Sequence, residues 1–113
     1  MKLTKKTEKV VITPSKTTTI FEYAASDLAI SGAVAKINGR YPEKGFALNK
    51  RSKELVYVIS GSGEIITKDG EKSISEGDVI FLDSNEKFAW SGNLVLFMAT
   101  APKFDPDQHN VSD

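Results

Sequence analysis

Few residues of this 113-residue chain could do chemistry, because it has no cysteine and a single histidine, His109. The lack of cysteine excludes a disulfide framework, a thiol nucleophile and a cysteine-based zinc site. One histidine excludes any site within one chain that uses two, so a metal would be held mainly by oxygen ligands. The glycines Gly61 and Gly63 do not mark a phosphate-binding loop, because no helix is expected to follow them. We expect His109 to be a solvated surface residue.

The charge balance argues against nucleic acid as a partner. Fifteen Lys and Arg residues match fifteen Asp and Glu residues, so the chain lacks the basic footprint of a nucleic-acid binder. Lysines prevail from Met1 to Lys16, and aspartates prevail from Asp105 to Asp113. We expect two solvated ends, and the alternative is head-to-tail pairing of two chains.

No stretch predicts contact with a membrane. No apolar run approaches the ~18 residues of a membrane span. The positive start at Met1 is not followed by the apolar segment of a signal peptide. We therefore expect a cytoplasmic protein.

The elements that must position the reactive groups are short strands separated by turns. Apolar and β-branched runs stop at turn pairs such as Asn38-Gly39 and Asp69-Gly70. Helical periodicity is hard to find, and residues 22–30 could make one turn at most. The expected strands include residues 10–12, 17–21, 33–37, 55–59, 64–67, 79–82, 88–90 and 94–98. This spacing predicts an all-β jelly-roll barrel of two facing antiparallel sheets, with little or no helix.

The chain is expected to form one domain over residues 1–113. No linker, repeat or low-complexity segment divides it. The expected core covers about residues 9–101. The last residues, 102–113, contain two prolines and many polar side chains, which predicts an irregular C-terminal tail on the surface.

The stretch from Gly39 to Gly92 resembles the cupin family of small jelly-roll barrels. Six residues separate Glu54 from Gly61, as in the first cupin motif, and the run from Gly77 to Leu82 matches the opening of the second. The resemblance implies the cupin fold. It implies no single function, because the family hosts enzymes, binding proteins and storage proteins.

The chain departs from this family at the metal site. Cupins usually hold Fe, Mn, Ni or Zn with two His and a Glu from the first motif and a His from the second. Here Glu54 is kept, but the histidine positions carry Leu48 and Lys50 in one spacing, Ala47 and Asn49 in the other, and Phe88 in the second motif. The resemblance therefore implies a cupin barrel that has lost its metal and needs no cofactor, unless His109 folds back or arrives from a partner chain.

The resemblance places five pocket candidates around the vacated metal position: Leu48, Lys50, Glu54, Phe88 and Trp90. Aromatic walls with a few polar groups are typical of a small-molecule pocket, and a Trp face suits a sugar ring. One alternative is that Phe88 and Trp90 plug the barrel as core. Another is that Glu54 pairs with Lys50 as a buried ion pair.

Three functions remain open. The first is the binding of a small organic ligand, a carbohydrate or a carboxylate, in the barrel mouth without chemistry. The second is an enzyme, either an isomerase or epimerase that uses Glu54 and Lys50 as acid and base or an atypical metal-dependent cupin enzyme. The third is a structural or interaction role for a homodimer, because exposed sheet edges invite pairing.

Overall fold

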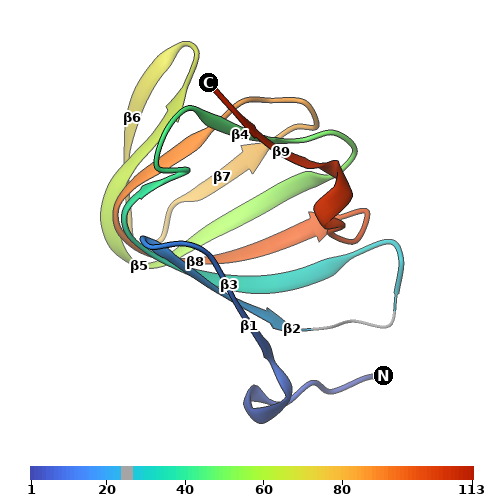
Figure 1. The fold of residues 1–113 in the computed structure, drawn as a ribbon. Helices are drawn as coiled ribbons and strands as arrows, with labels where there is room; N and C mark the ends of the chain where they lie inside the picture. Colours follow the sequence, from blue (N-terminus) through green and yellow to red (C-terminus); the bar gives the residue numbers. More distant parts are fainter. Residues whose placement is uncertain (24–26) are drawn as a thin grey trace.

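The computed structural model, which describes residues 1–23 and 27–113, folds these residues into strands and two 3₁₀ turns (Figure 1). The strands are β1 (Val10–Ser15), β2 (Thr18–Tyr23), β3 (Ser31–Tyr41), β4 (Phe46–Asn49), β5 (Lys53–Thr67), β6 (Gly70–Ser75), β7 (Val79–Leu82), β8 (Ala89–Ala101) and β9 (His109–Ser112). The turns are η1 (Lys6–Glu8) and η2 (Pro106–Gln108). No helix of the described part is long and apolar enough to cross a membrane. The expected all-β class is confirmed.

Two antiparallel sheets build the barrel. The larger one has the order β1-β2-β3-β8-β5-β6, and β7 also pairs with β5. The smaller one consists of β4 and β9. Reciprocal backbone hydrogen bonds of 2.8 and 2.9 Å between Ala47 and Phe88 add a bridge between β4 and the residue before β8. The large sheet curls, so that β4 and β9 lie across the barrel from β3 and β8 (Figure 1).

The long strands β5 and β8 form the framework of the barrel. They pair from Lys53 opposite Ala101 to Ile66 opposite Ala89, with a register shift between Val58 and Ser60. The first part of β5 also pairs with β7, and its second part pairs with β6. Both strands therefore run the length of the barrel and supply side chains to its interior.

The glycine that ends the first cupin-like motif is required at a close approach of β5 to β8. Gly61 has a φ of +91°, a conformation that residues with a Cβ rarely adopt. A Cβ at this position would also collide with the carbonyl oxygen of Asn93 on β8. The six-residue spacing therefore sets how far the inward Glu54 carboxylate lies along β5 from the point where Gly61 meets β8.

The core is made mainly by inward side chains of the large sheet. Val56 and Val58 of β5 and Leu94 and Leu96 of β8 are almost completely buried. The packed cluster also contains Ala35, Ile37, Ala47, Ile65, Ile74, Leu82, Phe88 and Trp90. Trp90 and Phe88 therefore belong to the core and also border the cavity described below.

The C-terminal segment is more ordered than the expected irregular tail. Residues 109–112 form β9, which pairs with β4 with Asn49 opposite His109 and Phe46 opposite Ser112. The prediction of an irregular tail was wrong at these residues because their partner strand lies far away in the sequence. The helical turn considered for residues 22–30 is not formed at residues 22–23 or 27–30, and residues 24–26 lie outside the described part.

Candidate functional site

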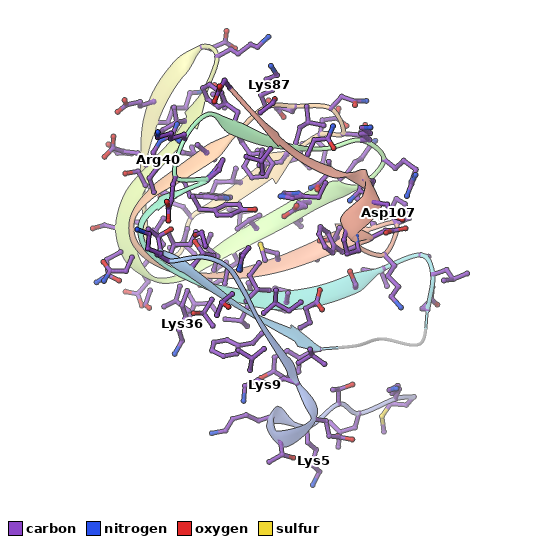
Figure 2. All side chains as sticks on the ribbon, viewed as in Figure 1. Lys5, Lys9, Lys36, Arg40, Lys87 and Asp107 are labelled. Atoms are coloured by element: carbon purple, nitrogen blue, oxygen red, sulfur yellow. The ribbon has the colours of Figure 1, made fainter. Side chains whose placement is uncertain are left out.

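A cavity of about 460 Å³ lies inside the barrel. The inner faces of β1, β2, β3 and β8 form most of its wall, and the segment after β8 closes part of it. Apolar and aromatic side chains predominate, among them Ile20, Leu96, Met98, Phe88, Trp90 and Phe104. Figure 2 shows side chains filling the space between the strands, whereas the labelled Lys5, Lys9 and Lys36 project away from it. A concave, mostly apolar space of this size is typical of a small-molecule site.

Among the titratable groups that border this cavity, three belong to one hydrogen-bonded cluster. Glu54 comes from β5, Tyr41 from the end of β3, and His109 from the start of β9. The Glu54 side chain is inward because β5 alternates buried and exposed residues over its first half. These positions bring together residues from three distant parts of the chain.

Asn49 joins two of these groups. Its side-chain amide nitrogen donates a hydrogen bond to Glu54 Oε1, and its amide oxygen lies 2.8 Å from His109 Nδ1. The other ring nitrogen, His109 Nε2, lies 2.9 Å from the Tyr41 hydroxyl oxygen. Glu54, Asn49, His109 and Tyr41 therefore form one continuous polar chain, with Asn49 only 2% exposed.

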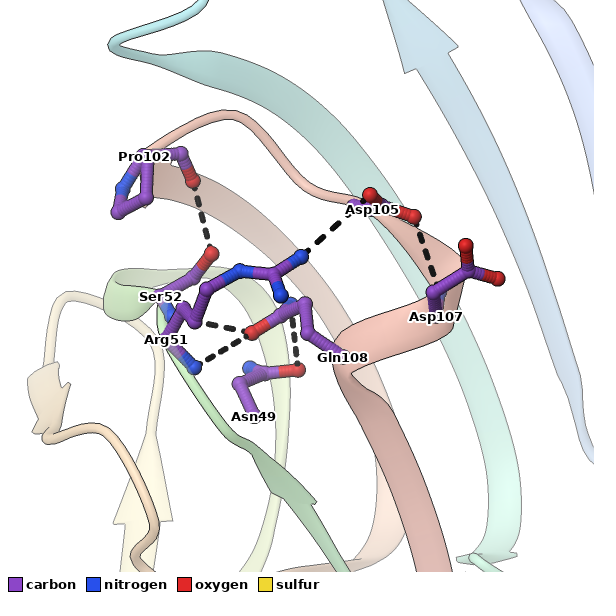
Figure 3. A network of polar contacts seen from close by, with 7 residues as sticks. All are labelled: Asn49, Arg51, Ser52, Pro102, Asp105, Asp107 and Gln108. Carbon is purple, nitrogen blue, oxygen red and sulfur yellow. Dashed lines mark hydrogen bonds and ion pairs between the residues drawn. The ribbon is translucent and has the colours of Figure 1, made fainter.

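The side-chain amide of Gln108 also contacts Asn49. The Gln108 side chain is 1% exposed, and its oxygen accepts the backbone N–H groups of Arg51 and Ser52 at 2.9 and 3.0 Å (Figure 3). Its nitrogen donates to Asn49 Oδ1 at 3.3 Å. The C-terminal segment is thus tied to the loop between β4 and β5 by buried polar contacts.

Burial shifts the pKa of all three groups. It raises the pKa of Glu54, although the hydrogen bond from Asn49 acts in the opposite direction. It lowers the pKa of His109, which favours the neutral imidazole. Burial raises the pKa of Tyr41, and the negative charge of Glu54 raises it further. Glu54 therefore holds its proton to a higher pH than an exposed glutamate, while His109 is neutral over a wider pH range.

Aromatic rings complete the wall around the polar chain. The Phe88 and Trp90 rings meet edge to face, with centroids 6.1 Å apart. The His109 ring is stacked on Tyr41 at 6.3 Å and tilted against Phe104 at 5.7 Å. These contacts hold the imidazole between two rings and leave apolar surface next to the titratable atoms.

The structure brings Glu54, Phe88 and Trp90 together at the cavity, but it places Leu48 and Lys50 outside its lining. On β4, Ala47 and Asn49 are buried, so the alternate residues Leu48 and Lys50 face the other way. Lys50 is exposed, and the Glu54 side chain bonds to Asn49 instead. The alternative that Glu54 pairs with Lys50 was therefore wrong. Of the two motif spacings, the one that puts Asn49 at a histidine position matches the buried side of β4.

Sequence reasoning missed Tyr41, Gln108 and His109 as members of this site. His109 is half-buried at the cavity and was wrongly expected to be a solvated surface residue. Its local sequence carried little signal, because its position depends on the pairing of β9 with β4 and on the burial of Gln108.

The residues present do not fit the metal site of the cupin family. Within residues 1–23 and 27–113, no three His, Cys, Asp or Glu side chains gather so that they could hold a metal ion. Glu54 and His109 supply two donors, and each already bonds to Asn49. We therefore derive no chemical step through a metal at this position.

Comparison with known proteins places the chain by its fold. No protein-family model and no curated protein sequence matches it. A variant of Pac13 from Streptomyces, solved with uridine, superposes with a TM-score of 0.88 at 16% identity over 98% of this chain and 90% of that one. Pac13 is described as a unique nucleoside dehydratase.

Two further solved structures have the same fold as this chain. KdgF from Halomonas superposes with a TM-score of 0.76 at 14% identity, over 92% of this chain and 97% of that one. An RmlC-like cupin from Shewanella frigidimarina does so with a TM-score of 0.72 at 12% identity, over 90% of both chains. The sequence resemblance and these superpositions agree that this chain is a β-barrel with the cupin fold.

Proposed function

We propose that the chain is an enzyme that binds a small organic molecule in the barrel and moves a proton on it. The carrying observation is the buried polar chain from Glu54 through Asn49 and His109 to Tyr41 beside a cavity of about 460 Å³. Hydrogen-bonded titratable groups with shifted pKa values at a cavity are typical of acid–base enzymes, and this arrangement supports the proposal.

The proposed roles follow from the charges of these groups. Neutral His109 is able to take a proton through the Tyr41 hydroxyl, which lies 2.9 Å from its Nε2. Glu54 holds its proton to a raised pH and is the acid, since it can protonate a leaving hydroxyl or a neighbouring carbon. Proton removal beside a carbonyl followed by loss of a hydroxyl as water is a dehydration, and proton return at another carbon is an isomerisation.

The cavity wall supports a neutral, ring-shaped substrate. Trp90, Phe88 and Phe104 offer ring faces and edges. Lys103 is the one Lys or Arg among the described lining residues, and it is exposed. This lining favours the carbohydrate over the carboxylate among the ligands expected from the sequence. The likeness to Pac13, solved with uridine, makes nucleosides the first class to test.

A hydrogen-exchange experiment tests this function. The protein is incubated in D₂O with a panel of nucleosides and sugars that carry a carbonyl and a neighbouring hydroxyl, and ¹H NMR follows loss of C–H signals and new alkenes. We expect turnover of at least one compound, lowered about 10²–10⁴-fold by Glu54→Gln or Tyr41→Phe. The exposed Glu76→Gln is the matched control and keeps the wild-type rate. Ligands that bind but never exchange or react would instead support a binding protein.

The outer face of the large sheet favours a second role, association with another copy of this chain. Residues paired in register form a row across six strands: Val11, Phe21, Val34, Phe97, Tyr57 and Val79. Four of them are more than 40% exposed, and exposed apolar rows of this kind mark interaction sites. Lys9 and Lys36 lie over the Phe21 ring at one end, and the exposed Asp78 precedes Val79 at the other.

We therefore also propose that two copies pair through this face about a two-fold axis, which sets the basic end of one row against the acidic end of the other. Light scattering tests it. We expect a dimer that Val79→Glu converts to a monomer, whereas Val111→Glu, similarly exposed but on β9, leaves it intact. A wild-type monomer at working concentration would contradict the dimer proposal and would not bear on the enzyme proposal.

A further inference from the structure

We propose that Gln108 and Asn49 are positioning residues that hold neutral His109 with its proton on Nδ1 and its lone pair on Nε2, facing Tyr41. The assignment rests on hydrogen-bond donors and acceptors alone, and only its catalytic meaning rests on the proposed function. It fixes the place of each exchangeable proton in the site.

Two backbone N–H groups fix the orientation of the Gln108 side chain. The N–H groups of Arg51 and Ser52 can only donate, and both point at one side-chain atom of Gln108, at 2.9 and 3.0 Å (Figure 3). That atom must therefore be the amide oxygen. The Gln108 backbone is held as well, because its carbonyl accepts from Lys50 N at 2.8 Å and its N–H donates to Asp105 O at 3.1 Å.

The orientation of Gln108 decides that of Asn49. With its oxygen occupied, the Gln108 NH₂ group faces Asn49 at 3.3 Å and can only donate. The Asn49 atom that meets it must be the oxygen, so the Asn49 NH₂ group is turned to Glu54. The Asn49 backbone has little freedom, because it pairs with His109 in the small sheet and its carbonyl accepts from Asn85 N at 2.7 Å.

The orientation of Asn49 decides the tautomer of His109. The Asn49 oxygen lies 2.8 Å from Nδ1, so Nδ1 carries a proton in every protonation state of the ring. In the neutral ring Nε2 then has no proton, and the Tyr41 hydroxyl donates to it across 2.9 Å. A proton taken up by His109 can enter only at Nε2, on the side of Tyr41.

The hydrogen bond from Asn49 also bears on the position of the Glu54 proton. Its Oε1 accepts from the Asn49 NH₂ group and is occupied. A protonated Glu54 therefore favours its proton on Oε2, the oxygen that Asn49 does not bind, because the carbonyl oxygen of a carboxylic acid is its better acceptor. Asn49 thus separates two proton-carrying groups, one at Nε2 and one at Oε2, and cannot itself pass a proton between them.

NMR can read this tautomer directly, because His109 is the one histidine of the whole chain. Long-range ¹H–¹⁵N spectra of uniformly labelled protein are recorded above the pKa of the imidazole. We expect a protonated, pyrrole-like Nδ1 and a pyridine-like Nε2. A wild-type spectrum with the proton on Nε2, or with both nitrogens averaged, would overturn the proposal, and this arm needs no variant.

Two variants test the positioning itself. Asn49→Leu removes the acceptor at similar size, and Gln108→Met removes the group that orients Asn49. We expect each folded variant, checked by circular dichroism, to lose the pure Nδ1–H signature, with the larger change for Asn49→Leu. Asn110→Leu, an exposed neighbour on β9, is the control and keeps the wild-type spectrum. A wild-type tautomer in folded Asn49→Leu would overturn the assigned role.

The assigned tautomer and the proposed enzyme function are tested by different measurements, so one can be wrong while the other stands. If the spectra agree but no compound exchanges a proton, the positioning stands and the proposed function does not. If exchange occurs while neutral His109 carries its proton on Nε2, the enzyme stands and the positioning role is wrong. In both cases Tyr41→Phe provides a further check, because it should change the Nε2 shift and leave the Nδ1 proton in place.

Discussion

The cavity is shared by two regions of the molecule that are held in place by different forces. The barrel strands β3, β5 and β8 supply apolar walls and Glu54, and packing and long strand pairing fix them. The C-terminal segment 102–113 supplies Phe104 and His109, and it is held by buried hydrogen bonds of Gln108 and a short strand pair. We therefore expect stability to reside mainly in the barrel, and the proposed proton chemistry to depend on the segment.

The largest expected effect lies in the barrel. Leu94 is 1% exposed within the packed core, so Leu94→Ala should lower the free energy of unfolding by about 2–5 kcal/mol, through lost burial and the void left behind. Phe104→Ala in the C-terminal segment should cost less, because Phe104 is half-buried at the cavity edge. Urea denaturation measures both. Equal losses would contradict the division of roles between the two regions.

The second prediction concerns the polar anchor of the C-terminal segment. Gln108→Ala deprives the backbone N–H groups of Arg51 and Ser52 of their acceptor. An unsatisfied buried donor costs about 1–3 kcal/mol, so we expect a loss of that order in urea denaturation. Asp107→Ala, at an exposed neighbouring position, is the control and should stay close to the wild type. Full stability of Gln108→Ala would mean that strand pairing alone holds the segment.

The two regions also differ in how far the sequence predicted them. The barrel was predictable, because alternating apolar runs and turn glycines are local signals, and the spacing from Glu54 to Gly61 points to one fold. The register of β4 was not predictable, because a shift of one residue exchanges its buried and exposed sides. The sequence therefore offered Lys50 as a pocket residue, whereas the structure has Asn49 at the site. His109 was missed because its position depends on a strand partner far away in the sequence.

The third prediction compares the pH dependence of stability in the two regions, beginning with Glu54. Its pKa is raised above the ordinary 4.5 by burial, so the folded state binds its proton more tightly than the unfolded state. Stability is then lost as pH rises from 4.5 through the folded pKa. Glu54→Gln should remove this loss in thermal unfolding, most clearly on the alkaline side of that window. An unchanged pH profile would show that Glu54 is not desolvated.

His109, in the C-terminal segment, should have the opposite sign. Burial lowers its pKa below the ordinary 6.5, so the unfolded state takes up a proton first. Stability is lost as pH falls from 6.5 through the folded pKa, and it is fully present above 6.5. His109→Asn should remove this acid-side loss in the same thermal scans and leave the alkaline side as in the wild type. The same sign for both variants would contradict the assigned burial of one of them.

The smallest expected effect comes from the outside of the C-terminal segment. Arg51 and Asp105 form an ion pair of 3.4 Å, but their side chains are 60% and 49% exposed. Water and salt screen such a pair, so Arg51→Ala should cost no more than about 1 kcal/mol in urea denaturation, and added salt should reduce the difference. Because the Arg51 backbone N–H still donates to Gln108 in this variant, the His109 tautomer should also stay unchanged. A loss as large as that of Gln108→Ala would show that surface charge, and not the buried amide, holds the segment against the barrel.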